Sequence, residues 1–416
     1  MARVLFDIGL LPYIMRNIWP SPAEYIAAVL SLRQTCRDLR DVANTLPMRE
    51  FAVGLFLVRG PRLACRDYVA FMQVRRHHNM HTYTPQTLAA ARQMCPAAAK
   101  IGLHQCLSHV APADLPHLGD LCMLTIMCNT HLTDVSMLGQ VHTLNLTGCS
   151  AVTDISALTG VGVLDISYCD GITSVHSARY AHTLVMRGCS AVRDVGMLGS
   201  LHTLNLTYCH NIADVSALGG LHTLDISHCR NVRDVSALGR LHTLRMWYCG
   251  QVSDVAALGG VHTLDARGCE SIVDVSMLRH THTLNLAGCP RVCDVSALGN
   301  THTLDLACCH LVHDVSALKN VHTLDVSHCP LITDVSALKN VHTLDVSHCP
   351  LITDVSALKN VHTLDVSHCP LITDVSMLGR AYSIKAWYCA GIRDVSMLLG
   401  RVVVLDLRGC SEVSVH

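Results

Sequence analysis

The chain has 416 residues, half of them apolar and only 15% charged, so it can bury a large core and general disorder is excluded. Its net charge of −1 at pH 7 argues against a nucleic-acid-binding protein that depends on phosphate contacts. No apolar run approaches the roughly 18 residues that a membrane span needs, so we expect neither a nucleic acid nor a membrane as partner.

Residues 1–100 follow different rules from the rest of the chain. All four Phe lie within the first 71 residues, and the region carries 13 Lys and Arg against 6 Asp and Glu, a net +7 where the remainder is −8. Ser21-Pro22 fits a helix N-cap followed by proline at the first helical position, and the apolar residues of 26–39 recur at helical spacing. Another helix is indicated over 85–100. We therefore predict a helical domain over 1–60 and a helical linker or cap over 61–100.

Part of this region resembles a known motif. Leu11-Pro12 opens a helix and leads to the segment Ser31–Arg40, SLRQTCRDLR. Over Leu11–Ala43 this pattern resembles the F-box. The resemblance implies docking onto a Skp-type linker protein, and through it a cullin, by Leu11, Pro12, Ile14, Ile18 and Leu32. The alternative is that these helices only cap a neighbouring solenoid, as the end of any repeat array requires.

From residue 121 the chain repeats every 20 residues. Residues 321–340 and 341–360 are identical, thirteen Cys recur at 20-residue steps from Cys149 to Cys389, and Cys410 follows one residue late, which indicates an insertion near Leu399–Gly400. The pattern L-x-x-L-x-L-x-x-C-x-x-I, then T-D-V-S-A-L, resembles the cysteine-containing leucine-rich repeat. This resemblance implies an α/β right-handed solenoid of about fifteen repeats over 101–416, with a parallel sheet on its concave face and short helical or 3-10 turns on its convex face. Together with the N-terminal motif, it resembles the F-box/leucine-rich-repeat family.

The repeat at 221–240 explains why the copies must stack. Leu224 and Ile226 alternate with polar residues, which predicts a short strand with its apolar side inward. The remaining inward positions are Leu221, Cys229, Val232, Val235 and Leu238. Seven inward residues cannot form a core alone, so neighbouring repeats must cover one another.

Three polar residue types recur in register. An Asp precedes each V-S-A-L segment, as Asp234 does, and is expected to cap the following helical turn. The Cys row is expected to be reduced, buried and structural, without a metal site, which implies a cytoplasmic or nuclear compartment. A His at the second repeat position is expected to form an exposed rim, or alternatively a pH-responsive row; these are His142, His182, His202, His222, His242, His262, His282, His302, His322, His342 and His362.

Two repeats depart from the mildly acidic pattern of the outward strand positions. Arg245, Trp247 and Tyr248 in one, and Lys385, Trp387 and Tyr388 in the other, replace the acidic residue by a base and add Trp-Tyr. These residue types are enriched at binding hot spots. We therefore predict a partner-binding surface there, extended by Tyr168 and Tyr208. The alternative for Trp387 is that it only seals the C-terminal end of the stack.

No phosphate-binding loop, zinc-protease motif or nucleophile elbow occurs, so we expect neither an enzyme nor a cofactor. The function that the resemblance implies is the substrate-recognition adaptor of an SCF-type ubiquitin ligase, with the repeats holding a protein target. The alternative is a leucine-rich-repeat binding scaffold with no ubiquitin connection, whose N-terminal helices act only as a cap.

Overall fold

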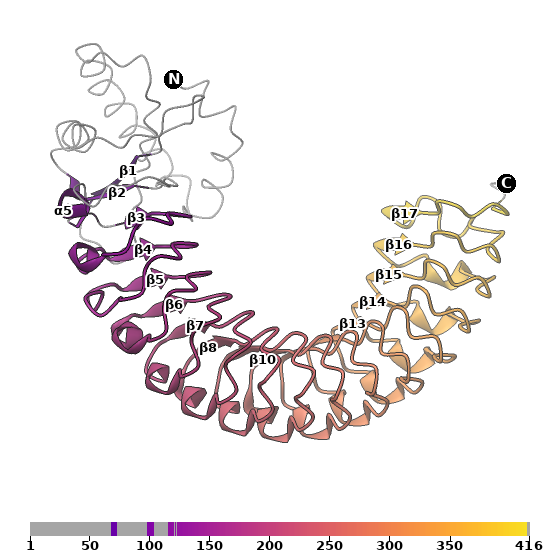
Figure 1. Cartoon of the computed structure of the whole chain (residues 1–416). Helices are drawn as coiled ribbons and strands as arrows, with labels where there is room; N and C mark the ends of the chain where they lie inside the picture. Colours follow the sequence, from indigo (N-terminus) through magenta and orange to yellow (C-terminus); the bar gives the residue numbers. More distant parts are fainter. Residues whose placement is uncertain (1–67, 73–97, 104–114, 120, 122, 414–416) are drawn as a thin grey trace, which may run out of the picture. The chain divides into compact units, whose positions relative to one another are not determined.

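The computed structural model describes residues 68–72, 98–103, 115–119, 121 and 123–413 (Figure 1). The predicted domain at 1–60, with its F-box-like positions, lies outside these residues. The chain divides into two units, 1–104 and 105–416. No helix in the described part has both the length and the apolar character that crossing a bilayer requires.

The described residues of the first unit include strands β1 (Tyr68–Met72) and β2 (Ala98–Leu103), which pair in parallel. The end of the helix expected over 85–100 is therefore wrong, because Ala98 to Lys100 belong to β2. Backbone pairing with β1 satisfies these residues in place of a helix, and helix propensity yields to such pairing.

The second unit is a stack of short parallel strands. After helix α5 (Leu115–Leu118), its described strands are β3 (Met123–Thr125), β4 (Thr143–Asn145), β5 (Val163–Asp165), β6 (Thr183–Val185), β7 (Thr203–Asn205), β8 (Thr223–Asp225), β9 (Thr243–Arg245), β10 (Thr263–Asp265), β11 (Thr283–Asn285), β12 (Thr303–Asp305), β13 (Thr323–Asp325), β14 (Thr343–Asp345), β15 (Thr363–Asp365), β16 (Ser383–Lys385) and β17 (Val404–Asp406). Each strand pairs with the next in parallel.

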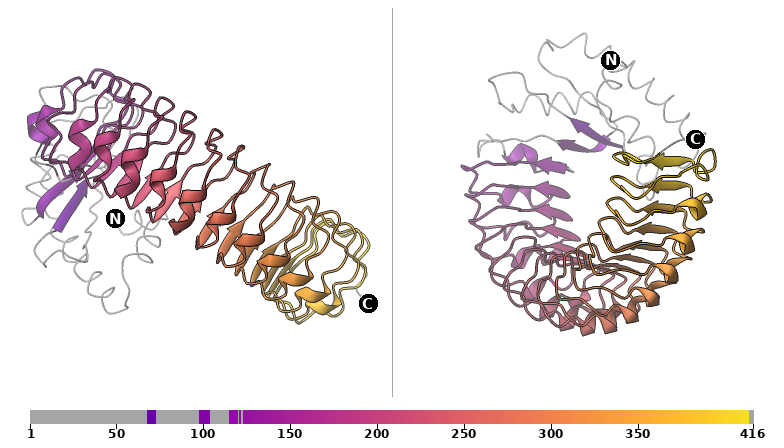
Figure 2. Two further views of the ribbon diagram at one scale, coloured as in Figure 1. Left: turned by 90° about the horizontal axis from the view of Figure 1, so that it is seen from below. Right: turned by 90° about the vertical axis from the view of Figure 1, so that its right-hand side faces the viewer.

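The strands line the inner side of a curved unit and 3-10 turns line its outer side (Figures 1 and 2). These turns are η2 (Ser136–Leu138), η3 (His176–Tyr180), η4 (Gly196–Leu198), η5 (Ser216–Gly220), η6 (Ser236–Leu238), η7 (Ala256–Gly260), η8 (Ser276–Leu278), η9 (Ser296–Leu298), η10 (Ser316–Leu318), η11 (Ser336–Leu338), η12 (Ser356–Leu358) and η13 (Ser376–Leu378). The predicted solenoid with a parallel sheet and short 3-10 turns is therefore confirmed.

The pairing register follows the 20-residue period. Leu224 pairs with Leu244 and Leu264 with Leu284, so each position lies beside its counterpart one repeat later. From β16 to β17 the offset is 21, with Ile384 beside Leu405, which places the insertion in the connection as predicted. All seven inward residues of repeat 221–240 are buried, so the core is one continuous column of Leu, Val, Ile and Cys.

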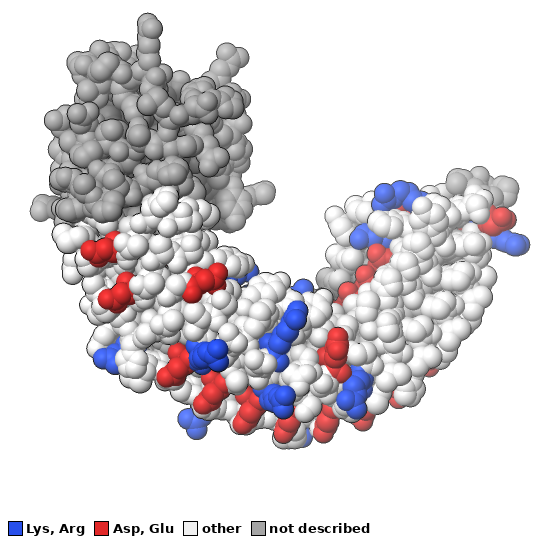
Figure 3. Space-filling model, viewed as in Figure 1, with Lys and Arg blue, Asp and Glu red and all other residues white. Residues whose placement is uncertain are grey.

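The recurrent Asp caps the 3-10 turn from slightly outside it. The Asp234 carboxylate accepts the backbone N–H of Ser236, two residues on, at 2.8 Å. Hydrogen bonds from the Ser236 side chain and backbone lower the pKa of Asp234. The turn begins at Ser236, so the Asp stands one residue before the N-cap position, Val235, although its bonding role is the one expected. Acidic side chains recur along the outer rim of the arc (Figure 3).

The Cys residues from Cys149 to Cys389 form a buried ladder with free thiols. The Cys229 thiol donates to the carbonyl oxygen of Leu206 at 3.1 Å, and the same bond recurs along the ladder. Burial raises the pKa of Cys169 and Cys249 to about 12, so these thiols stay protonated and act as donors. Among the described residues, no group of three or more His, Cys, Asp or Glu is arranged to hold a metal ion.

Two buried hydroxyl groups break the apolar core. The first repeat position is Val in the neighbouring repeats 261, 321 and 341 but Thr at 281 and 301. Both Thr side chains are buried and their Oγ1 atoms have no hydrogen-bond partner. A buried hydroxyl without a partner loses its bonds to water and gains nothing in return.

We therefore expect Thr301→Val to raise the free energy of unfolding by about 1–2 kcal/mol, because it removes the orphaned hydroxyl without changing side-chain shape. Chemical denaturation measures the change. The control is Thr303→Val, two residues on, whose hydroxyl lies 3.2 Å from His302 Nδ1 and which should not stabilise the fold. A Thr301→Val midpoint at or below that of the native chain would contradict the assignment.

Candidate partner-binding site on the strand face

The inner face of the sheet carries a row of carboxylates. Asp305, Asp325, Asp345 and Asp365 succeed one another on β12 to β15. Each accepts the backbone N–H two residues on, as Asp325 does from Ser327 at 2.9 Å. Burial raises the pKa of Asp305, Asp325 and Asp345. This row is the background from which two clusters differ.

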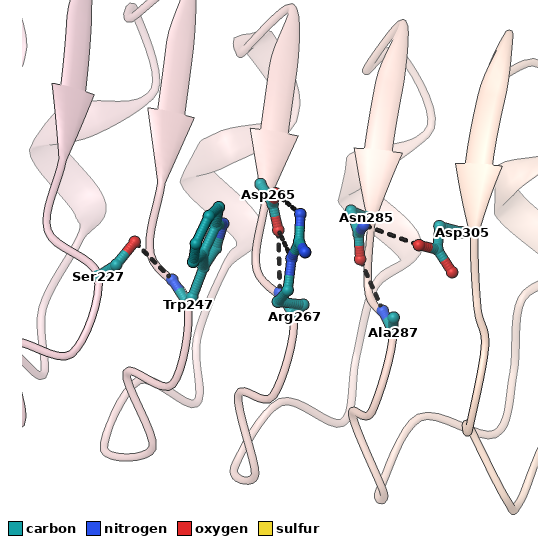
Figure 4. Close-up of polar contacts among 7 residues, drawn as sticks. All are labelled: Ser227, Trp247, Asp265, Arg267, Asn285, Ala287 and Asp305. Carbon is teal, nitrogen blue, oxygen red and sulfur yellow. Dashed lines mark hydrogen bonds and ion pairs between the residues drawn. The ribbon is translucent and has the colours of Figure 1, made fainter.

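The first cluster forms around Trp247, just after β9 (Figure 4). The Arg267 guanidinium lies 4.3 Å from the centre of the indole ring, a cation–π contact. Asp265 holds that guanidinium with two bonds, of 3.0 Å to Nε and 2.6 Å to Nη2. On the other side, the Ser227 hydroxyl oxygen accepts the Trp247 backbone N–H at 3.2 Å. We call Arg245, Trp247, Tyr248, Asp265 and Arg267 the Trp247 cluster.

Trp247 is more enclosed than the sequence suggested. Its position points away from the core as predicted, but Arg267 covers the indole and leaves the residue half-buried. The indole Nε1 is buried and has no hydrogen-bond partner. Arg245 is exposed and, within the described part of the chain, makes no ion pair. The cluster therefore presents a rigid aromatic surface beside a free cation.

An aromatic column continues the Trp247 cluster along the face. The rings of Tyr208 and His228 stack at 4.3 Å, and those of His228 and Tyr248 at 4.9 Å. The column ends because Gly268 follows Tyr248, and a Cβ there would lie 2.6 Å from the tyrosine ring. Tyr168 is likewise followed by Gly188, so it stands apart from Tyr208. Of the two predicted extensions, only Tyr208 joins the cluster.

The second cluster repeats the first at β16. The Arg408 guanidinium lies 4.1 Å from the Trp387 ring centre and bonds to both oxygens of Asp406 at 2.9 Å. Ser367 accepts the Trp387 backbone N–H at 3.1 Å. Because β17 and Arg408 follow it, Trp387 does not seal the end of the stack. We call Lys385, Trp387, Tyr388, Asp406 and Arg408 the Trp387 cluster.

The correspondence extends over three consecutive repeats. Asp225, Ser227 and His228 precede the first cluster as Asp365, Ser367 and His368 precede the second, and Gly268 and Gly409 both receive a tyrosine ring. One difference concerns the free cation, since Lys385 Nζ lies 3.7 Å from Asp365 whereas Arg245 is unpaired among the described residues. Sequence reasoning missed Arg267 and Arg408; the signal was the shared D-x-R-G-C of 265–269 and 406–410.

The predicted linker-docking residues, Leu11, Pro12, Ile14, Ile18 and Leu32, lie outside the described residues. The two Trp clusters and Tyr208 therefore make up the candidate site on the described part of the chain. Their aromatic rings, exposed cations and ordered backbones suit them to binding.

Comparison with known proteins agrees with this architecture. The family model "Leucine Rich repeat" matches residues 317–339 and 337–359. An internalin of Listeria monocytogenes, InlF, is 18% identical over 71% of this chain and 91% of its own, with a TM-score of 0.48. The functional domain of InlJ from the same organism, which includes a cysteine ladder, is 19% identical over 68% and 62%, with a TM-score of 0.37. TLR13, solved in complex with ssRNA13, is 15% identical over 70% and 58%, with a TM-score of 0.47.

No curated protein sequence matches the chain significantly. The family match falls on two of the repeats, and the register of β3 to β17 carries the same pattern through the second unit. Folds of this type are typically binding surfaces without enzymatic activity. The 20-residue register, the buried thiols and the family match together make the chain a leucine-rich-repeat protein with a cysteine ladder.

Proposed function

We propose that this chain is a non-enzymatic binding module that holds a protein partner on its strand-lined inner face, with the Trp247 cluster as the main anchor. The observation that carries this proposal is the recurrence of one constellation of Trp, Tyr, base, Asp and Arg at two places in an otherwise uniform array. Core packing does not require it, because the other repeats pack without it.

The geometry of the Trp247 cluster suits an anchor. Asp265 and Arg267 fix one side of the indole and Ser227 fixes its backbone, so little conformational freedom remains to be lost on binding. Arg245 offers a free guanidinium to a carboxylate or carbonyl group of the partner. Tyr248 and Tyr208 extend the aromatic surface, and Lys385, Trp387 and Tyr388 supply a second, weaker anchor whose cation is already near Asp365.

Selection of peptides from a displayed library on the full chain, followed by affinity measurement, tests this proposal. Trp247→Ala is expected to weaken the selected peptides by about 2 kcal/mol, roughly thirtyfold in Kd. Met277→Ala is the matched control, because Met277 is 46% exposed but lies on η8, on the outer side. Equal losses in the two variants, or none in Trp247→Ala, would contradict an inner-face anchor.

We further propose that the bound protein is a ubiquitination target and that the chain is the adaptor of a cullin-type ligase in a cytoplasmic or nuclear compartment. The support for this finer function is the F-box-like pattern of Leu11–Ala43 ahead of cysteine-containing repeats. In it, the N-terminal residues dock the Skp-type linker protein and the repeats present the target.

Calorimetry of the full chain with a Skp-type linker protein tests the adaptor role. Binding is expected for the native chain and for Trp247→Ala, and its loss is expected in the double variant Leu11→Ala/Pro12→Ala, because only the latter alters the docking motif. Absence of binding by the native chain at tens of micromolar would leave a binding scaffold with no ubiquitin connection.

A further inference from the structure

A column of ten imidazole rings runs along one edge of the sheet, separate from the two Trp clusters. Adjacent rings from His182 to His362 stack with centroids 4.5–4.7 Å apart, and Tyr382 ends the column. At ~4.7 Å per strand the column is on the order of 40 Å long. Its members are His182, His202, His222, His242, His262, His282, His302, His322, His342 and His362, and all are exposed.

The stacking leaves one edge of each ring open to solvent. Both ring faces are covered by neighbouring rings, except at the column ends. Nδ1 lies 3.1–3.3 Å from the hydroxyl oxygen of the following Thr in nine of the ten residues, as between His322 and Thr323. The edge that carries Nε2 therefore remains. In the imidazolium form this nitrogen is a donor, so protonation creates a row of N–H groups at a regular spacing.

Few charges near the column offset its protonation. Desolvation, followed by repulsion from the two flanking imidazoles, lowers the pKa of His222, His282 and His342. The charged groups nearest along the chain before the rings are basic, namely exposed Arg279, Lys319, Lys339 and Lys359, each three residues ahead of a column His. The Asp three residues after each of His322, His342 and His362 instead bonds to the backbone N–H of a Ser.

A second, shorter column provides the contrast. His328, His348 and His368 stack at 4.0–4.1 Å on the inner face. There the carboxylates of Asp345 and Asp365 act on His348 in the opposite sense to its neighbouring imidazoles, and Asp325 is coupled to His328. These three rings already have internal counter-charges, whereas those of the ten-membered column do not.

We propose that the ten-membered imidazole column, His182 to His362, is a binding surface for a linear sulfated polysaccharide at mildly acidic pH. Sulfate groups along the polymer accept from the Nε2–H groups and relieve the repulsion between neighbouring imidazolium ions. Because the anion stabilises the protonated column, polymer binding and proton uptake must strengthen each other. The flanking Lys and Arg residues add permanent positive charge along the same edge.

The column favours such a polymer over single-stranded nucleic acid. Sequence-tolerant binding of single strands relies on bases stacking upon aromatic faces. Here those faces are occupied by one another, and only ring edges are available. The surface is independent of the proposed function, since it lies at the second repeat position and not at the outward strand positions of the Trp clusters.

Binding of the full chain to heparin, with EDTA present to exclude bridging metals, tests the proposal. Affinity is expected to be roughly tenfold or more higher at pH 5.5 than at pH 7.5, because the ordinary pKa of His lies between the two. Calorimetry at pH 6.5 in two buffers of different ionisation enthalpy should show proton uptake on binding. That measurement needs no variant and does not depend on how a variant folds.

Two triple variants with equal loss of histidine locate the effect. His302→Gln/His322→Gln/His342→Gln should lose most of the pH-dependent gain and lower the salt dependence of log K by about one per histidine protonated in the complex. The control, His328→Gln/His348→Gln/His368→Gln, should retain the gain. Equal behaviour of the two variants, or absence of proton uptake, would overturn the column as the site. Tighter pH-dependent binding of oligo(dT) than of heparin of equal charge would overturn the polysaccharide as its partner.

Discussion

In-register pairing of short parallel strands is the constraint on which the rest of the structure depends. It places every residue beside its counterpart one repeat later, so a residue type that recurs every 20 positions becomes a continuous column. Inward Leu, Val and Ile form a core that no single repeat can bury. The same register aligns the Cys thiols, each donating to a carbonyl in the preceding repeat, and stacks the imidazole rings at the strand spacing.

The register also converts departures from the repeat into sites. Trp247 and Arg267 are 20 residues apart, yet the pairing of β9 with β10 brings the guanidinium over the indole. Asp265 then orients that guanidinium within its own repeat. Two changes in adjacent repeats thus suffice to build a pre-ordered surface on a uniform background. Such surfaces leave buried polar atoms unpaired, as at Trp247 Nε1, a feature that a core position tolerates poorly.

Much of the second unit was predictable because its information is periodic. The alternation of Leu224 and Ile226 with polar residues identified the strand, and the late Cys410 identified the insertion between β16 and β17. Contacts between repeats were less accessible, because a pattern describes one repeat at a time. Arg267 and Arg408 were missed for this reason. The left-handed backbone at Tyr208, His228 and Tyr248 was also missed, since these residue types rarely adopt positive φ. β1 and β2 lie in a region without a period to guide prediction.

Removal of one copy from the identical pair 321–340 and 341–360 tests the dependence on register most directly. Deletion of 341–360 keeps every position beside its counterpart, so we predict a folded chain with native circular dichroism and a denaturation midpoint close to that of the full protein. Deletion of 341–350 alone shifts all later repeats by half a period and should disrupt the stack beyond β13. Similar loss of structure in the two deletions would contradict the account, because register would then not be what holds the repeats together.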